Sequence, residues 1–433
     1  MPAHGPVALG LSLPLWSVVP FAGLLLSIAL LPLFAPSLWV RHYAKVCLAF
    51  GVPVAGFFLL RAPRELLHTV LEYASFLILL ASLFTISGGI LLRGTLRGSA
   101  GVNCAILAVG AVLANVFGTT GASMLLIRPL LRANAHRHRK AHVVVFFIFV
   151  VANIGGALTP IGDPPLFLGY LRGVPFFWTL RAMGLLWAVA AGLVIGAFYL
   201  VDRRAFALDT VAGGDLAAAS GEARVPLSIE GKINLPLLMV VIGAVFLPTP
   251  WREMAMVAAA FVSAWKTPAK VREENEFTWY PIEEVAVLFA GIFATMIPAL
   301  LILKARGAEL GVVTPAHFFW ATGVLSSFLD NAPTYLTFAS MASGLMGTEA
   351  VRLDQLLRAT TGGMHGETLL TAISVGAVSM GANTYIGNGP NFMVKAIAEE
   401  AGIKMPSFFG YMKYTIGILL PLFLLVTLVF FRP

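Results

Sequence analysis

The chain has 433 residues, of which 58% are hydrophobic and only 12% are charged. An ordinary soluble domain has roughly 25% charged residues, so this composition excludes a soluble globular protein. The net charge of +8 does not indicate nucleic-acid binding, because the basic residues stand in short loops between apolar runs, as the positive-inside rule predicts. We therefore expect an all-α polytopic membrane protein, since lipid leaves helices as the spanning element for runs of this kind.

Ten apolar segments approach or reach the roughly 20 residues that a helix needs to cross a bilayer. The first is too long for a signal peptide and follows a stretch without Lys or Arg, so we interpret it as a retained span. The ten predicted spans are residues 16–34, 44–61, 67–92, 141–168, 181–201, 232–248, 251–266, 282–303, 368–396 and 410–431. Two further segments, 100–131 and 315–345, carry Gly, Pro, Asn or Asp in their middle, which favours re-entrant hairpins.

Basic loops predict the orientation. If both termini lie outside, the most basic loops all fall on the inner side; they are Arg41 to Lys45, Arg93 with Arg97, Arg132 to Lys140, Arg203 with Arg204, and Lys266 to Arg272. We interpret the run from Arg132 to Lys140 as a topological anchor and not as a histidine metal site. The expected location is the inner membrane of a bacterium, with both termini in the periplasm.

An internal repeat organises the chain. The segment TPIGDPPLFL, residues 159–168, recurs as TYIGNGPNFM, residues 384–393, with seven of ten positions alike if Asp/Asn and Leu/Met are paired. Each copy follows a predicted hairpin. The distribution of basic loops places the start of the first repeat unit inside and the start of the second outside. This predicts two inverted-topology repeats, each with a re-entrant hairpin and a broken transmembrane helix, as in many secondary transporters.

The repeat defines the expected domain organisation. Residues 1–43 hold an extra N-terminal span, 44–201 form the first repeat, 202–250 form a cytoplasmic linker with a connecting span, and 251–433 form the second repeat. The polar part of the linker is residues 202–231.

Gly and Pro meet in the middle of each repeated segment, where a helix should unwind. Unwound backbone offers carbonyl oxygens and helix ends that hold ions at mid-membrane. The alternative is that these residues only kink packed helices. The polar side chains predicted to line the site are Asn153, Thr159 and Asp163 in the first copy, and Asn383, Thr384 and Asn388 in the second.

The hairpins supply the remaining candidates. They are Thr119, Thr120 and Ser123 in the first, and Asp330, Asn331 and Thr334 in the second. An ionised carboxylate at mid-membrane costs about 3 kcal/mol or more, so Asp163 and Asp330 are predicted to be functional. Burial favours a proton and an arriving cation favours the ionised form, so one Asp can carry either a proton or sodium. The alternative is an acid that only locks two helix ends.

Three motifs are similar to those of the ion transporter superfamily: NIGGALTPIGD (residues 153–163), LDNAP (329–333) and ANTYIG (382–387). That superfamily includes D-type sodium:proton antiporters, arsenite pumps, citrate carriers and divalent-anion:sodium symporters. The chain most resembles bacterial proteins called either sodium:proton antiporters or citrate transporters, over about residues 44–431.

The resemblance implies a homodimer with a fixed scaffold and a mobile transport part that moves by an elevator-like step. It also implies a cation site, for sodium, at Asp163 and Asp330, lined by Asn331, Thr334, Asn383 and Thr384. The Ser-Asn-Thr signature of the dicarboxylate symporters is missing from both hairpins, and the second break has Ala382-Asn-Thr384 in its place. The Asp-Asn-x-Pro of the second hairpin resembles the antiporters.

Three functions remain open from the sequence. Two acids without a basic residue in the expected site favour sodium:proton antiport, with sodium and protons as transported ions and no cofactor. Citrate or another carboxylate is the alternative, because helix N-termini and hydroxyls can hold an anion. A membrane enzyme or scaffold would leave the broken helices unexplained, and neither His365 nor Glu367 stands in the spacing of a zinc protease.

Overall fold

The computed structural model describes residues 6–94, 96–212, 226 and 228–432 of the chain. The described chain is mostly helical, and its strands form only two short antiparallel pairs. In the first half the elements are α1 (Pro6–Ser12), η1 (Leu15–Val18), α2 (Val19–Phe34), α3 (Pro36–Arg61), α4 (Pro63–Ser87), β1 (Leu91–Arg93), α5 (Ala100–Ala133), α6 (Ala141–Val150), η2 (Ile154–Leu158), α7 (Pro164–Leu171) and α8 (Trp178–Ala212).

The second half begins with β2, which pairs with β1 so that Leu91 lies opposite Glu230. Its elements are β2 (Ser228–Glu230), α9 (Asn234–Ala244), α10 (Trp251–Lys266), α11 (Ala269–Glu274), α12 (Tyr280–Arg306), η3 (Gly307–Leu310), α13 (Pro315–Ser326), α14 (Asn331–Leu345), α15 (Leu353–Arg358), β3 (Thr360–Thr361), β4 (Met364–His365), α16 (Gly366–Met380), η4 (Gly381–Asn383), α17 (Gly389–Glu400), α18 (Phe408–Tyr414), η5 (Thr415–Leu419) and α19 (Leu420–Phe430).

Eight helices in the described residues are long and apolar enough to cross a membrane, and the chain is a multi-pass membrane protein. Seven of them coincide with predicted spans, and the eighth is Ala100–Ala133, which the sequence predicted as a hairpin. The structure gives this segment as α5, whose two helical parts meet at Gly118, where φ is 73°. Asn103 in its first turn exchanges hydrogen bonds with Asn134 at its end, at 2.8 and 2.9 Å, so the segment folds back on itself. The segment 315–345 divides into α13 and α14 around residues 327–330. Re-entry of either segment into the membrane stays a prediction.

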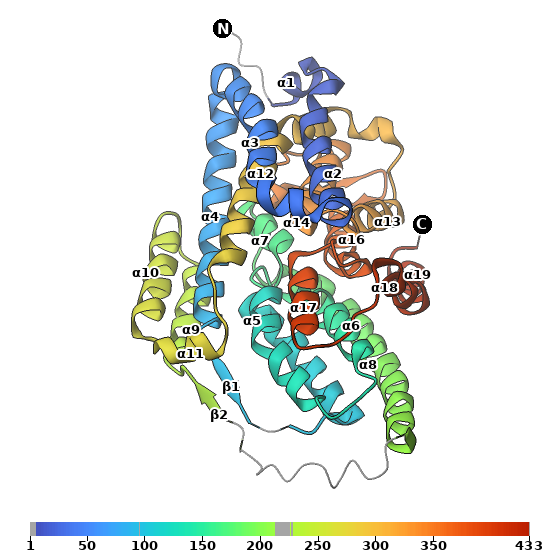
Figure 1. Cartoon of the computed structure of the whole chain (residues 1–433). Coiled ribbons are helices and arrows are strands. Elements are labelled where there is room, and N and C mark those ends of the chain that lie inside the picture. The colour runs from blue at the N-terminus through green and yellow to red at the C-terminus, as the bar shows by residue number, and fades with distance from the viewer. Residues whose placement is uncertain (1–5, 95, 213–225, 227, 433) are drawn as a thin grey trace.

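Two predicted spans contain short helices, of which the second has the predicted bounds. Segment 232–248 contains α9 with 11 residues, and segment 251–266 contains α10 with 16, whereas a perpendicular crossing needs about 20. In Figure 1 these two helices lie side by side next to α4. Each therefore falls short of a full crossing as a straight helix.

The first part of the predicted linker is helical. Helix α8 continues to Ala212, so residues 202–212 extend the helix that contains the predicted span 181–201. Residues 213–225 and 227 lie outside the described part of the chain.

The two predicted broken helices are interrupted as expected. After α6 and η2, residues 159–163 are non-helical before α7 begins at Pro164; after α16 and η4, residues 384–388 are non-helical before α17. Proline stands in the first turn of both α7 and α17, where its missing N–H leaves no bond unmade.

Burial places the first of these broken helices at the centre of the molecule. In the apolar window Ala141–Leu158, 89% of the residues are buried, compared with 22% in Pro36–Arg61 and 28% in both Trp178–Asp209 and Phe408–Phe430. The helices α3, α8 and α19 expose much of their apolar surface, and the polar side chains near the breaks lie inside.

Candidate functional site

The two breaks lie against each other through amide side chains. The Asn153 amide N–H₂ donates to the Asn391 side-chain oxygen at 2.7 Å and to the carbonyl of Ile148 at 2.8 Å. Asn388 donates to the side-chain oxygen of Asn153 at 3.2 Å and to the carbonyl of Ala152 at 3.1 Å. Segments more than 200 residues apart in sequence thus form one polar centre.

Asp163 is the buried acid of this centre. It stands at the N-terminal end of α7 and is 1% exposed. The Thr119 hydroxyl, one residue after the interruption of α5, donates to Oδ1 of Asp163 at 3.0 Å. The Asn331 amide, in the first turn of α14, donates to Oδ2 at 2.9 Å. Both carboxylate oxygens are therefore bonded, one by each predicted hairpin segment.

Asp330 lies at the edge of the same centre. It is half-buried, and its Oδ1 accepts the N–H of Ala332 at 3.1 Å, which caps the N-terminus of α14. Its own neighbour Asn331 donates to Asp163. The Thr334 hydroxyl donates to the Asp330 carbonyl at 3.0 Å. Asn331 therefore connects the two acids, with Asp163 inside and Asp330 nearer the surface.

The repeated threonines make equivalent bonds. The Thr159 hydroxyl donates to the carbonyl of Asn115 at 2.6 Å, and the Thr384 hydroxyl donates to the carbonyl of Ser327. In both cases a hydrogen bond joins the break to the segment that the sequence predicted as the hairpin of the same repeat. This agreement accounts for the repeated Thr, while the inverted topology of the two halves stays a prediction.

Helix N-termini surround the carboxylates. Helices α7, α14 and α17 start at Pro164, Asn331 and Gly389, each directly after a site residue, and the second part of α5 starts after Gly118. Free N–H groups and the helix dipole give such ends a partial positive charge. These ends stabilise an ionised carboxylate and would also favour a bound anion.

The other predicted site residues differ in their surroundings. The Asn383 amide donates to the Ser327 hydroxyl at 2.9 Å, while its buried Oδ1 has no hydrogen-bond partner among the described residues. The Ser123 hydroxyl is likewise buried and without a described partner. Thr120 is half-buried beside Thr119. Buried polar atoms without a protein partner usually bind water or an ion.

Two residues that the sequence reasoning omitted hold the breaks in shape. The Asn391 amide donates to the carbonyls of Gly381 and Thr384 at 2.8 and 2.9 Å. Asn115 donates to the carbonyl of Gly155 at 2.7 Å and accepts the N–H of Leu158 at 2.8 Å. An Asn within an apolar segment was the available signal, because a buried amide must find partners.

The donor set fits a hard monovalent cation better than a transition metal. Among the described residues no three His, Cys, Asp or Glu side chains form a metal-binding group. The site instead offers carboxylate, amide and hydroxyl oxygens, which are the ligands of hard cations. Because both oxygens of Asp163 already accept bonds, a cation that binds this carboxylate must share it with Thr119 and Asn331 or replace one of them.

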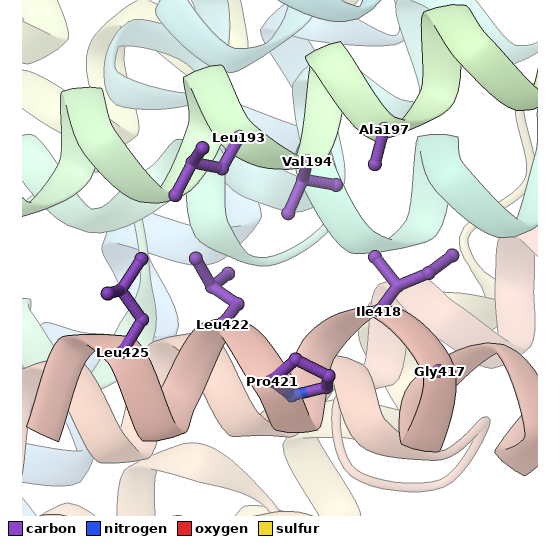
Figure 2. A pocket seen from close by; sticks show the side chains of 8 residues that line it. All are labelled: Leu193, Val194, Ala197, Gly417, Ile418, Pro421, Leu422 and Leu425. Atoms are coloured by element: carbon purple, nitrogen blue, oxygen red, sulfur yellow. The ribbon is translucent and has the colours of Figure 1, made fainter.

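A second cavity has a different character. A pocket of about 260 Å³ lies between α8 and the helical segment η5–α19. Figure 2 shows the residues that line it: Leu193, Val194, Ala197, Gly417, Ile418, Pro421, Leu422 and Leu425. All of these side chains are apolar, so the cavity offers no ligand to an ion. The polar centre around Asp163 is therefore the candidate transport site.

Comparison with known proteins adds one finding. A family model described as "Putative citrate transport" matches residues 10–431. A search of curated proteins finds no significant match.

Proposed function

The chain belongs to this citrate transport family and is a multi-pass membrane transporter, and we propose that it exchanges sodium ions for protons at the Asp163–Asp330 site. The proposal rests on one observation: the buried Asp163 carboxylate accepts one hydrogen bond from Thr119 and one from Asn331. These donors come from α5 and α14, so any ion on Asp163 acts on both halves of the chain at once.

Competition for one carboxylate is the physical basis of the exchange. An ionised Asp163 accepts from both donors and attracts a hard cation. A protonated Asp163 has lost its charge and has one oxygen occupied by hydrogen, so it holds a cation poorly. Sodium and a proton therefore exclude each other from the carboxylate. Movement of one ion down its gradient then drives the other ion across the membrane in the opposite direction.

Asp330 has a supporting role in this proposal. It is the more exposed of the two acids, and a second negative charge beside Asp163 increases the attraction for a cation while opposing full ionisation of the pair. We infer that Asp330 receives the ion from the aqueous side and passes it to Asp163.

Alternating access completes the proposal. The mobile part contains the broken helices and the α5 and α13–α14 segments, and the scaffold contains the outer helices α2 to α4 and α12. An elevator-like movement of one part within a homodimer would carry the site across the bacterial inner membrane, with both termini periplasmic. The large exposed apolar surface of α3 is compatible with contact to a second copy or to lipid.

Citrate transport is the second candidate, and the family description favours it. The helix N-termini described above provide N–H groups for carboxylates. Against it, none of the side chains that bond to one another around Asp163 is Arg or Lys.

One reconstituted system separates the two candidates. Purified protein in liposomes receives an imposed pH gradient, and sodium or labelled citrate is added. We expect sodium to collapse the gradient and citrate to remain outside. Asp163→Asn and Asp330→Asn should abolish the exchange, whereas Asp354→Asn, at a surface ion pair with Arg352, should not. Citrate uptake without sodium:proton exchange would replace the first candidate by the second, and full activity of either site variant would remove that acid from the mechanism.

A further inference from the structure

The apolar pocket of Figure 2 lies between two helical segments that face lipid. These segments, Trp178–Asp209 and Phe408–Phe430, are long and apolar enough to cross a membrane, and only 28% of the residues in each apolar window are buried. The lining side chains carry no polar group, and an apolar hollow of this kind does not hold ordered water. The hydrocarbon of the bilayer is therefore the medium that faces the pocket.

Residues within the two helices explain why the space is open. Ala197 presents only a methyl group, and Gly417 presents no side chain at all; a Cβ added at Gly417 would have no atom within 4 Å. Pro421 has no N–H to donate to the preceding turn, and the residues before it, Thr415–Leu419, are wound as a π-helix. Small residues and an irregular turn thus leave room for a ligand.

One end of the pocket leads to two basic residues. Figure 2 shows that the helices run antiparallel, with Ala197 opposite Ile418 and Gly417 at this end. Arg204 follows Ala197 after two turns of α8, about 10 Å further along and on the same face. Lys413 precedes Gly417 by one turn. Both side chains therefore lie beyond the same end of the pocket.

The depth of these residues places their charges at the membrane surface. Arg204 stands well beyond the roughly 20 residues after Trp178 that cross the hydrocarbon, and Lys413 stands in the first turns of Phe408–Phe430. Both residues are exposed, and neither side chain has an ion pair or hydrogen bond with a described residue. Long basic side chains keep their charge in the headgroup region while their stems follow apolar surface.

Neighbouring acids on the same helices do not neutralise this end. Residues 408–430 contain no Asp or Glu. On α8, Asp202 lies on a different face from Ala197 and is fully buried against Arg137, at 2.6 Å. Asp209 is also buried, 3.8 Å from Arg137. The basic end therefore keeps its positive charge for an anionic partner.

We propose that the pocket binds one anionic phospholipid of the surrounding bilayer, with an acyl chain against the apolar lining and the phosphate at Arg204 and Lys413. A phospholipid carries these two parts in the order in which the protein presents their partners, and basic pockets between spanning helices bind anionic headgroups. The bound chain also contacts the segment that holds the second break, because the Thr415 hydroxyl donates to the carbonyl of Asn383 at 2.8 Å. Lipid on this face therefore supports the break from outside.

Native mass spectrometry of the full-length protein tests the charge requirement. The purified protein is titrated with dioleoyl phosphatidylglycerol or dioleoyl phosphatidylcholine, which have the same chains and differ in net charge. We expect one phosphatidylglycerol to bind more tightly than phosphatidylcholine. Arg204→Gln and Lys413→Gln should each weaken its binding about fivefold, the effect of one basic residue at a membrane surface. The control Lys232→Gln, an exposed lysine before α9 on the far side of Figure 1, should bind as wild type.

Filling the pocket tests its position. Gly417→Leu places a side chain in the open space and should abolish the tight phosphatidylglycerol site. Gly192→Leu on α8 is the matched control, because its Cβ position is equally open and it does not line the pocket. If Gly417→Leu does not fold, the two charge variants decide.

Three results would overturn the proposal. The first is equal binding of the two lipids by the wild type, and the second is phosphatidylglycerol binding that the charge variants leave unchanged. The third is a Gly417→Leu protein that loses its dimer but keeps its lipid affinity, which would assign the pocket to a second copy of the chain. No transport measurement enters this test, so its outcome is independent of the proposed sodium:proton exchange.

Discussion

Gly162 and Gly387, one in each break, lie close to backbone carbonyls, so replacing each with alanine disturbs the two breaks to different extents. An alanine Cβ at Gly162 would lie 2.1 Å from the carbonyl oxygen of Gly156, whereas real Cβ atoms essentially never come closer than 3.0 Å. The backbones must therefore separate by about 0.9 Å, the difference between these distances. At Gly387 the nearest atom is the carbonyl oxygen of Gly381 at 2.5 Å, so about 0.5 Å is required.

These displacements fall next to the site. Gly162 precedes Asp163, and its carbonyl accepts the N–H of Thr119 at 2.9 Å, so both partners of the Thr119–Asp163 bond move. Overpacking of this kind costs about 1–3 kcal/mol, and a misplacement of about 1 Å in a functional site can cost about 10²-fold in rate. We expect Gly162→Ala to lower the initial rate of sodium:proton exchange by about that factor, and Gly387→Ala to lower it less.

Gly389→Ala is the matched control, because nothing lies within 4 Å of its Cβ position. The assay is the initial rate in liposomes, with the thermal unfolding midpoint of each purified variant measured in parallel. Gly389→Ala should retain both the rate and the midpoint. A Gly162→Ala variant with a wild-type rate and midpoint, or a Gly389→Ala variant as damaged as Gly162→Ala, would refute the reasoning from backbone contact.

Three further substitutions follow from single contacts. Thr119→Val removes a hydrogen bond to a carboxylate that is worth about 1.5–3 kcal/mol, so the sodium concentration for half-maximal exchange should change by 10-fold or more, while Thr119→Ser should behave as wild type. The buried guanidinium of Arg172 makes two hydrogen bonds to Glu72, at 2.8 and 2.9 Å, and Glu72→Gln removes its counter-charge. The expected cost of about 3–5 kcal/mol should lower the unfolding midpoint, and an unchanged midpoint would contradict this. Asn391→Leu should reduce both the unfolding midpoint and the exchange rate, since the carbonyls of Gly381 and Thr384 in the second break lose the amide that donates to them. A variant normal in both would show that the amide is dispensable.

The sequence predicted the breaks because their cause is local. Gly and Pro in the middle of an apolar segment disrupt a helix whatever surrounds them, and both interruptions occur where the repeat places them. The partners of the breaks have no such local signature. Asn391 bonds to Asn153 across 238 positions, and a single Asn in an apolar run is compatible with many partners, so only the fold identifies its role.

Errors in the prediction also have physical reasons. Hydropathy cannot distinguish α9 from a full span, because apolar loop residues extend the run beyond the helix. The sequence interpreted the run that contains Arg137 as a topological anchor, and nothing in that run shows that the guanidinium is buried against the carboxylate of Asp202. That counter-charge stands 65 positions further along the chain, beyond the reach of a pattern in one loop.

The position of Asn331 explains why the two halves must act together. It stands beside one acid in sequence and bonds to the other in space, at 2.9 Å, while Thr119 approaches the same carboxylate from the first half. A proton on one oxygen of Asp163 weakens the hydrogen bond that this oxygen accepts. A cation on Asp163 must share the carboxylate with Thr119 and Asn331 or displace one of them. Occupancy of a single buried side chain therefore changes contacts in α5 and α14 simultaneously, which is the coupling that an exchange of two ions through one site requires.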